Sequence, residues 1–322
     1  MTASANRTSA ANDPLLHEIE LPLHATYYPL GFRLNLATNS RHVLDAGREA
    51  WGGYTAEFER EPIEIRLIVL PGGPLVEEPP VFRGQGDLFS ITYDRHNFGV
   101  YDSGSLFGYC FVSEKTAGDH LRLRMYFLEA MTYSLLAQRH VVPMHAAAVM
   151  HEGRGVLLCG PSGAGKSTLS YACARAGWTF VSDDATWLPA DESIRILIGR
   201  PGAARFREDA PRLFPELARY AAEQHPNGKM TIEASTADFA LRTSLRCPAD
   251  HMVLLDRRPG GARLDSIPAC ELVDRLLADM PAFGERVRTL YERTLSRLLD
   301  TAAWRMQYET LDQALKLLSE LK

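Results

Sequence analysis

The sequence predicts an α/β protein with an N-terminal α+β domain and a C-terminal domain in which strands and helices alternate. Short apolar runs separated by turn residues dominate the N-terminal part, as in IRLIVL at 65–70 and LFSITY at 88–93. An amphipathic pattern follows from Asp119 to Arg139, and a strand, a glycine-rich loop and a helix come next at 156–176. With 322 residues, the chain is long enough for two domains.

Composition and charge exclude several classes of protein. Asp and Glu outnumber Lys and Arg by 40 to 35, and the net charge of −5 gives no reason to expect binding to nucleic acid or to a membrane surface. No apolar run approaches the roughly 18 residues that a membrane-spanning helix needs. The five cysteines are widely spaced without a CxxC pair, so we expect reduced thiols rather than disulfides or a zinc site. The sequence therefore predicts a cytoplasmic protein that binds neither nucleic acid nor membranes.

The composition changes along the chain in three steps. Residues 1–14 are small and polar, which predicts a disordered leader. Residues 15–140 form the predicted N-terminal α+β domain, which ends in the amphipathic helix as a linker. Residues 141–322 form the predicted second domain, and apolar spacing over 269–299 and 309–321 indicates helices at its C-terminal end.

The most informative segment is VLLCGPSGAGKST at 156–168, which matches the pattern G-x-x-x-x-G-K-[ST] between an apolar strand and a helical run. Glycines let the backbone N–H groups turn inward, the helix N-terminus attracts anions, and Lys166 adds a full positive charge. We therefore predict ATP and Mg²⁺ as ligands, with Ser167 on the metal. The predicted nucleotide-binding residues are Gly160, Pro161, Ser162, Gly163, Ala164, Gly165, Lys166, Ser167 and Thr168.

Two carboxylates follow the next predicted strand. A helix over 166–176 ends before Gly177, and WTFVS at 178–182 is predicted to form a strand that runs into Asp183 and Asp184. Parallel strands of a βαβ unit end at the same edge of the sheet, so both acids should emerge beside the glycine loop. One acid could hold Mg²⁺ while the other accepts the proton of an attacking hydroxyl. The alternative is a solvated turn that ends the strand.

His145 begins the apolar segment HAAAVM at 145–150, which is predicted to form a hairpin with GVLLC at 155–159. A turn centred on 153–154 would place position 162 of the glycine loop opposite His145, with an uncertainty of about two residues. This pairing favours a role for His145 at the terminal phosphate. The alternative is a histidine that is hydrogen-bonded for structure alone.

Residues 144–188 resemble the catalytic domain of HPr kinase/phosphorylase and its wider group of related bacterial kinases. His145 precedes Lys166 by 21 residues and Asp184 follows it by 18, as the histidine, loop lysine and catalytic aspartate of that family do. The resemblance implies that Asp184 deprotonates a protein serine and returns a proton in the reverse phosphorolysis, and that Ser167 binds the metal. We assign Asp183 to Mg²⁺ and its water.

The resemblance also implies a fold. It is a P-loop kinase domain of the HPr kinase and phosphoenolpyruvate carboxykinase-like type, behind a separate N-terminal α+β domain. The predicted activity is transfer of the γ-phosphate of ATP to a serine or threonine hydroxyl of a protein or peptide. The predicted catalytic residues are His145, Lys166, Asp183 and Asp184.

Two positions depart from the pattern of the HPr enzymes. Thr168 stands where those enzymes usually have an acid, and 197–209 lacks their E-x-R-G signature, so the usual second metal ligand is missing. The segment 190–322 is closer to divergent kinases of the group, some of which resemble enzymes found with peptide-modification systems. Three arginines here could bind phosphate or an acidic partner, or lie on a solvated face: Arg200, Arg205 and Arg207.

Three alternative functions remain open. One is a kinase for a small molecule such as free serine. Another is a P-loop ATPase, because HMVLLD at 251–256 resembles a Walker-B strand, although no LSGGQ-like signature occurs and Arg257 stands where a catalytic glutamate is expected. Asp256 would then be a reserve ligand of Mg²⁺. The last is a nucleotide sensor without phosphotransfer, and the sequence also leaves a homo-oligomer open.

Overall fold

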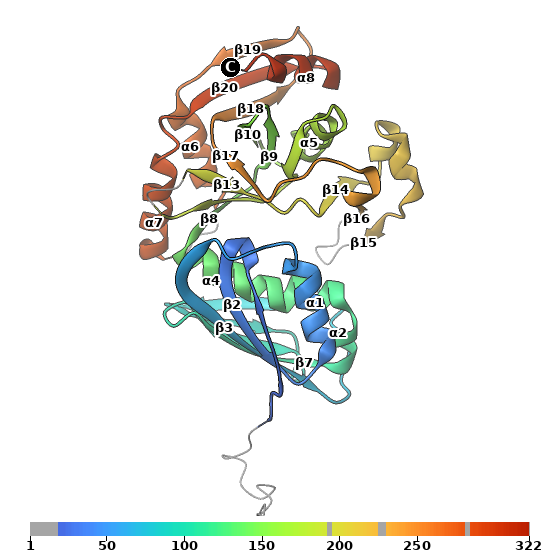
Figure 1. The fold of residues 1–322 in the computed structure, drawn as a ribbon, viewed down its shortest axis with the longest axis vertical. Helices are drawn as coiled ribbons and strands as arrows, with labels where there is room; N and C mark the ends of the chain where they lie inside the picture. Colours follow the sequence, from blue (N-terminus) through green and yellow to red (C-terminus); the bar gives the residue numbers. More distant parts are fainter. Residues whose placement is uncertain (1–18, 192–194, 225–229, 281–283, 322) are drawn as a thin grey trace, which may run out of the picture. The chain divides into compact units, whose positions relative to one another are not determined.

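The chain has a mixed α/β fold with several sheets (Figure 1). The structure is a computed structural model that describes residues 19–191, 195–224, 230–280 and 284–321. Its contacts divide the chain into two compact units, one up to Met131 and one from Thr132. The division falls inside a helix, whereas the sequence placed the domain boundary at the end of that helix. The leader predicted over 1–14 lies outside the described residues.

The N-terminal unit contains a seven-stranded sheet, as its β-rich pattern predicts. Buried and exposed side chains alternate along the third strand, in which Ile63, Ile65 and Leu67 are buried and Glu64 and Arg66 are exposed. One face of the sheet therefore packs against the interior of the unit. In spatial order, the strands are β1 (Leu23–Tyr27), β2 (Phe32–Thr38), β3 (Phe58–Leu70), β7 (Phe107–Ser113), β6 (Phe98–Asp102), β5 (Leu88–Thr92) and β4 (Val81–Gln85).

Helices of this unit include one that the sequence analysis did not identify. α1 (Arg41–Trp51) packs against β1 and β2 and buries Val43 and Trp51. The amphipathic pattern from Asp119 to Arg139 forms helical turns throughout, with a π-helical segment in the middle. The turns are α3 (His120–Leu123), the π segment (Arg124–Leu128) and α4 (Glu129–Arg139), and the short α2 (Glu114–Gly118) precedes them.

The C-terminal unit is built on a six-stranded sheet. Three neighbouring strands are parallel, β10 (Arg154–Cys159), β18 (His251–Arg257) and β20 (Ala302–Tyr308). β9 (Ala147–His151) lies antiparallel between β10 and β11 (Thr179–Ser182), so β10 and β11 run in the same direction. In spatial order, the strands are β11 (Thr179–Ser182), β9 (Ala147–His151), β10 (Arg154–Cys159), β18 (His251–Arg257), β20 (Ala302–Tyr308) and β19 (Arg263–Ser266).

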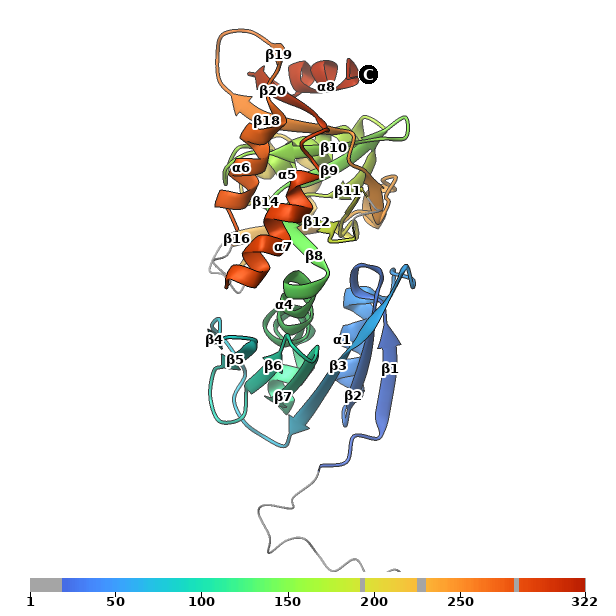
Figure 2. The ribbon, with the colours of Figure 1, turned by 90° about the vertical axis from the view of Figure 1, so that its left-hand side faces the viewer.

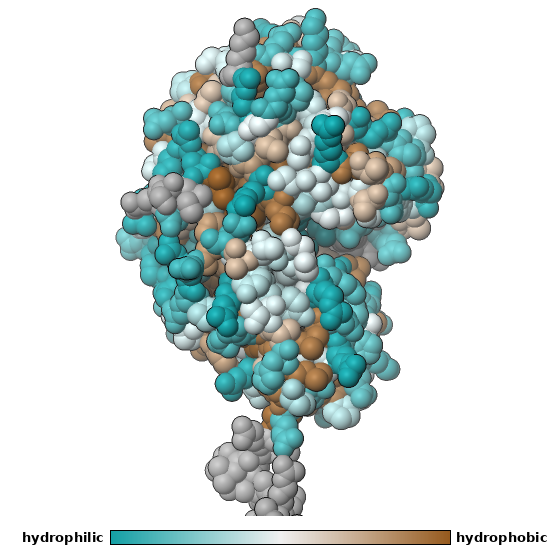
Figure 3. All heavy atoms as spheres, viewed as in Figure 1, coloured by the Kyte–Doolittle hydropathy of each residue, from teal (hydrophilic) through white to brown (hydrophobic). Residues whose placement is uncertain are grey.

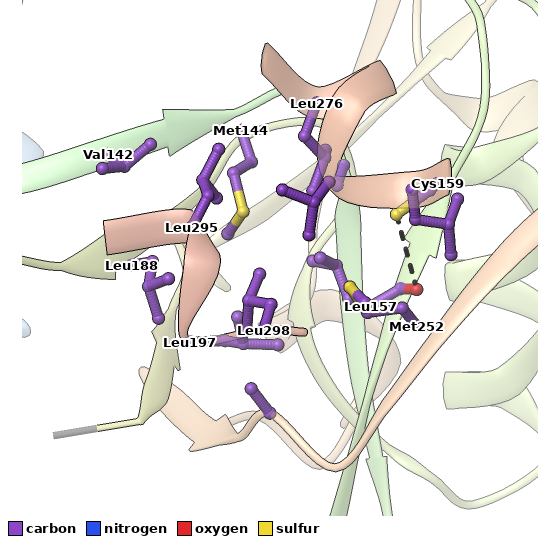
Figure 4. Packing of buried hydrophobic residues seen from close by; sticks show 14 of the residues in the cluster. Val142, Met144, Leu157, Cys159, Leu188, Leu197, Met252, Leu276, Leu295 and Leu298 are labelled. Atoms are coloured by element: carbon purple, nitrogen blue, oxygen red, sulfur yellow. Dashed lines mark hydrogen bonds between the residues drawn. The ribbon is translucent and has the colours of Figure 1, made fainter. Parts of the chain in front are cut away.

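Helices cover both faces of this sheet (Figures 1 and 2). Alternating residues of β10 explain the two layers, because Leu157 packs with the helices on one face and Leu158 with those on the other. The first face carries α6 (Ala269–Ala278) and α7 (Glu285–Ser296), where one helical stretch was predicted, and the second carries α5 (Lys166–Arg175) and α8 (Leu311–Ser319). Figure 4 shows the first layer, in which Leu276 of α6 and Leu295 of α7 belong to the same buried cluster as Leu157.

Two smaller sheets flank the central one. The four-stranded sheet has the order β17 (Arg246–Pro248), β13 (Ile196–Ile198), β12 (Thr186–Pro189) and β8 (Val141–Met144). The three-stranded sheet has the order β14 (Ala203–Arg207), β16 (Met230–Ser235) and β15 (Glu223–Gln224). The buried face of β14 contacts α5, where Phe206 packs edge-on against Tyr171. This contact places β14 beside the helix that follows the glycine loop.

The surface carries few large apolar side chains. On the face drawn in Figure 3, hydrophilic residues predominate and hydrophobic ones form small separate groups. Of the five cysteines, Cys270 is exposed and the others are buried, and all are free thiols. Within the described ranges, no helix combines the length and the hydropathy needed to span a membrane.

Candidate active site

The glycine loop connects β10 to α5, in the strand, loop and helix order that the sequence predicts. Gly163 and Gly165 have φ angles of 87° and 93°, which residues with a side chain rarely adopt. Gly165 is the N-cap of α5, and no side chain caps this helix end. The first N–H groups of α5 are thus left for an anion, and the loop curves around the same point.

Lys166 extends from the first turn of α5 back toward the loop. Its Nζ donates hydrogen bonds to the carbonyl oxygens of Gly160 at 2.8 Å and Pro161 at 3.3 Å. The side chain is buried, and loss of hydration lowers the pKa of the ammonium, while the nearby charge of Asp184 acts in the opposite direction. The ammonium therefore lies within the loop and close to the acid that the sequence selected as the base.

Two neighbouring segments of the chain pass between the four-stranded and the six-stranded sheet side by side. One contains β8 and β9, and the other contains β11 and β12. In the six-stranded sheet β9 pairs with β11, and Ala148 lies opposite Ser182. In the four-stranded sheet β8 pairs with β12, and Met144 lies opposite Thr186. From Met144 to Ala148 and from Ser182 to Thr186 the chain advances by four residues each. The same pairing register therefore continues across the unpaired residues between the two sheets. Residues in the two breaks therefore face each other.

His145 and Asp184 occupy these two breaks. Nε2 of His145 lies 3.1 Å from Oδ1 of Asp184, and both side chains reach solvent, with exposed fractions of 44% and 59%. The hydrogen bond from His145 is the largest cause that lowers the pKa of Asp184, and Lys166 and Arg205 contribute in the same sense. Asp184 is thus an ionised, accessible carboxylate with a fixed partner.

The sequence placed His145 at the start of a strand, and the structure corrects this. His145 lies in a bend between β8 and β9, because the chain leaves one sheet for the other at this point. The hairpin of β9 and β10 is present, with His151 opposite Arg154. Continuing that register would bring position 160, rather than 162, opposite His145, which is within the expected uncertainty.

Asp183 differs from Asp184 in its exposure and in the direction in which its pKa is shifted. It is only 7% exposed, and its Oδ2 accepts a hydrogen bond of 2.7 Å from the backbone N–H of Arg205. Burial raises the pKa of Asp183 to about 6, although this hydrogen bond and the charge of Arg205 oppose the shift. Ser167 Oγ donates to the carbonyl oxygen of Asp183 at 3.2 Å. The Ser167 hydroxyl therefore lies against the backbone of Asp183, and hydroxyl and carboxylate oxygens are donors that suit a hard cation.

The three arginines singled out in the sequence have three different environments. Arg200 lies over the ring of Tyr133, with its Cζ 5.4 Å from the ring centroid. Arg205 forms an ion pair with Glu233, at 2.8 Å between Nε and Oε2. The third, Arg207, lies beside the glycine loop, with Nη2 3.4 Å from the point where a Cβ on Gly163 would stand.

Some residues near the loop were not identified from the sequence, and one further candidate, Asp256, follows the β18 residue that lies beside Gly160. Glu233 supports Arg205 across the β14–β16 ladder, and the hydroxyl of Tyr308 donates to the carbonyl of Ala164 at 3.4 Å. Both contacts join segments that are far apart in the chain, so no short sequence motif indicates them. Asp256 at the end of β18 forms an ion pair with Arg258, at 3.1 Å.

Comparisons with known proteins give limited similarity. The family model of ScmC, described as a SynChlorMet cassette protein, matches residues 109–194. No curated protein matches the chain. Among solved structures, the HPr(Ser) kinase/phosphatase from Coxiella burnetii is similar with a TM-score of 0.31 and 14% identity, over 55% of this chain and 93% of that chain.

Proposed function

We propose that this chain is a Mg²⁺-dependent kinase that transfers the γ-phosphate of ATP to a serine or threonine hydroxyl of a protein or peptide. The observation that carries the proposal is the contact between His145 and Asp184 at 3.1 Å, close enough to the ammonium of Lys166 for the acid and the ammonium to shift each other's pKa. An ionised acid beside a cationic loop supplies both a base and a phosphate site.

The glycine loop and Lys166 would bind the phosphates of ATP. The uncapped N-terminus of α5 and the backbone N–H groups of the loop attract the negative charge. Lys166, now bonded to the carbonyls of Gly160 and Pro161, is positioned to exchange these neutral partners for phosphate oxygens. Binding and charge stabilisation would therefore come from the same loop.

Ser167 and Asp183 would hold Mg²⁺. In the described part of the chain, no group of three or more His, Cys, Asp or Glu residues could hold a metal ion by itself. Mg²⁺ usually relies on one or two carboxylates together with phosphates and water, so one carboxylate and one hydroxyl would be enough from the protein. When bound, the ion would neutralise charge on the β- and γ-phosphates.

Asp184 would act as the base. An acceptor hydroxyl needs an accessible carboxylate, and the exposure of Asp184 meets this requirement, whereas Asp183 is buried against Arg205. As the new O–P bond forms, the bond between the γ-phosphorus and the bridging oxygen breaks and ADP leaves with the electron pair. The hydroxyl proton passes to Asp184, and His145 keeps the carboxylate oriented through its hydrogen bond.

A transfer assay with γ-labelled ATP and Mg²⁺ tests this proposal. The acceptors are a pool of serine- and threonine-containing peptides and, separately, free serine. The proposal expects label on peptide hydroxyls as phosphoserine or phosphothreonine. Label on free serine alone would identify a small-molecule kinase instead. Release of inorganic phosphate alone would identify an ATPase, and absence of ATP binding would remove the nucleotide site altogether.

A further inference from the structure

β14 brings two arginines to the active site by strand alternation. Ala204 and Phe206 point to the buried side and pack in one cluster with Tyr171 of α5. Arg205 and Arg207 therefore lie on the opposite face of the strand. Because α5 begins at the glycine loop, a strand packed along this helix can carry side chains to the loop itself.

The first of these arginines is fixed at the acid pair. Its guanidinium is bound by Glu233, and its backbone N–H donates to the carboxylate of Asp183. Arg205 lies opposite Glu233 in the β14–β16 ladder, so both ends of this ion pair are held by paired backbone. The position of β14 relative to Asp183 is thereby set, and with it the position of the next arginine on this face.

Arg207 has a different set of contacts. Its Nη2 lies 3.4 Å from the point where a Cβ on Gly163 would stand, so the guanidinium is directly against the glycine loop. The side chain is exposed, and within the described ranges no hydrogen bond or ion pair of its guanidinium occurs. Its backbone is held in the ladder opposite Thr231. A rigid strand therefore presents an unpaired cation to a loop whose N–H groups already favour an anion.

We propose that Arg207 binds the γ-phosphate of the nucleotide in the glycine loop, as a second cation beside Lys166, and stabilises the charge on the phosphoryl group during transfer. This inference rests on the proposed function. Loop N–H groups and the helix N-terminus neutralise the inner phosphates, which leaves the terminal phosphate to cationic side chains. A guanidinium suits this role because its planar fork can donate to two phosphate oxygens at once.

The experiment measures dissociation constants of ATP and ADP, each with Mg²⁺, for the wild type and for Arg207→Gln and Arg207→Lys. Arg263→Gln is the matched control, since Arg263 is an exposed arginine on β19, the edge strand at the opposite end of the sheet from β11. We expect Arg207→Gln to weaken ATP by about 10- to 100-fold, as for loss of a charged hydrogen bond, and to leave ADP within about twofold. The dissociation constant of ATP for Arg207→Lys should lie between those of the wild type and Arg207→Gln. The control variant should bind both nucleotides as the wild type does.

The outcomes separate this inference from the proposed function. If the wild type binds neither nucleotide, the proposed function and the role of Arg207 both fail. If the wild type binds ATP and Arg207→Gln binds it equally well, the role of Arg207 alone is overturned. Equal weakening of ATP and ADP also contradicts a contact with the γ-phosphate. Thermal unfolding of each variant confirms that it is folded, and the substitution of an exposed side chain should leave the midpoint unchanged.

Discussion

His145 and Asp184 face each other across a break at which two paired segments leave one sheet for another. Their side chains meet at 3.1 Å, and the register of Ala148 with Ser182 continues to Met144 with Thr186 through the break, which makes the two residues diagonal neighbours. The short ladders β9–β11 and β8–β12 on the two sides of the break hold the backbone of both residues. Neither residue needs a flexible loop to hold it, and such support favours precise orientation of an acid–base group.

Lys166→Ala should weaken the binding of Mg·ATP and reduce transfer by at least about 10²-fold. The ammonium of Lys166 contacts the loop at the carbonyl of Gly160, and charge on the phosphates increases in the transition state. Calorimetry gives the affinity and a transfer assay gives the rate. A variant that binds ATP and turns over like the wild type would show that the nucleotide lies elsewhere.

Asp183→Asn should change how stability depends on pH in nucleotide-free buffer with a chelator. Burial raises the pKa of Asp183 from 3.8 to about 6, so the folded state keeps a proton that the unfolded chain has lost. The wild type therefore loses stability as pH rises from about 4 to 6, by roughly 1 to 3 kcal/mol, and the loss is then constant. The variant carries no such charge, so its unfolding free energy relative to the wild type should increase over this window.

Asp184→Asn is the matched control for that experiment. The hydrogen bond from His145 lowers the pKa of Asp184, so this carboxylate stabilises the folded state above the unfolded value of 3.8 and loses that effect as pH falls. Relative to the wild type, the control should therefore change below about pH 4, with the opposite sign, and should not rise over the window of about pH 4 to 6. The same trend in both variants, or none in Asp183→Asn, would contradict the environments described for the two acids.

Gly199→Ala should destabilise the C-terminal unit and displace the acid pair. A Cβ at Gly199 would stand 2.1 Å from the carbonyl oxygen of Val181, two residues before Asp183, so the backbone must move. Overpacking of this kind typically costs about 1 to 3 kcal/mol. Gly202→Ala is the control, because a Cβ there meets nothing within 4 Å. Equal unfolding midpoints for the two variants would contradict the close approach.

Local patterns predicted the central part of this site. The glycine motif and the apolar patterns on both sides of it lie close together in the sequence. They are therefore enough to predict β10, the loop, α5 and β11. The proximity of Asp184 to Lys166 was predicted from the rule that parallel strands joined by a helix end at the same edge of the sheet. That rule holds although β9 lies between β10 and β11.

Other features could not be predicted because they depend on contacts distant in sequence. His145 continues an apolar run, so its pattern gives no sign that the chain changes sheets there. The ion pair of Arg205 with Glu233 requires the pairing of β14 with β16. α1, by contrast, has a local signal that the sequence analysis did not use, because its buried residues Val43, Ala46 and Trp51 lie on one face of an amphipathic helix.

Replacement of Asp184 tests the central claim most directly. The measurement is the single-turnover rate of phosphate transfer from γ-labelled ATP to an unphosphorylated peptide that the pool assay identified as an acceptor, for the wild type, Asp184→Asn and His145→Ala. We predict a loss of about 10²- to 10⁴-fold for Asp184→Asn with ATP affinity nearly unchanged, and a smaller loss for His145→Ala. Transfer by Asp184→Asn at the wild-type rate, or full rescue by raised Mg²⁺, would contradict the assignment of Asp184 as the base.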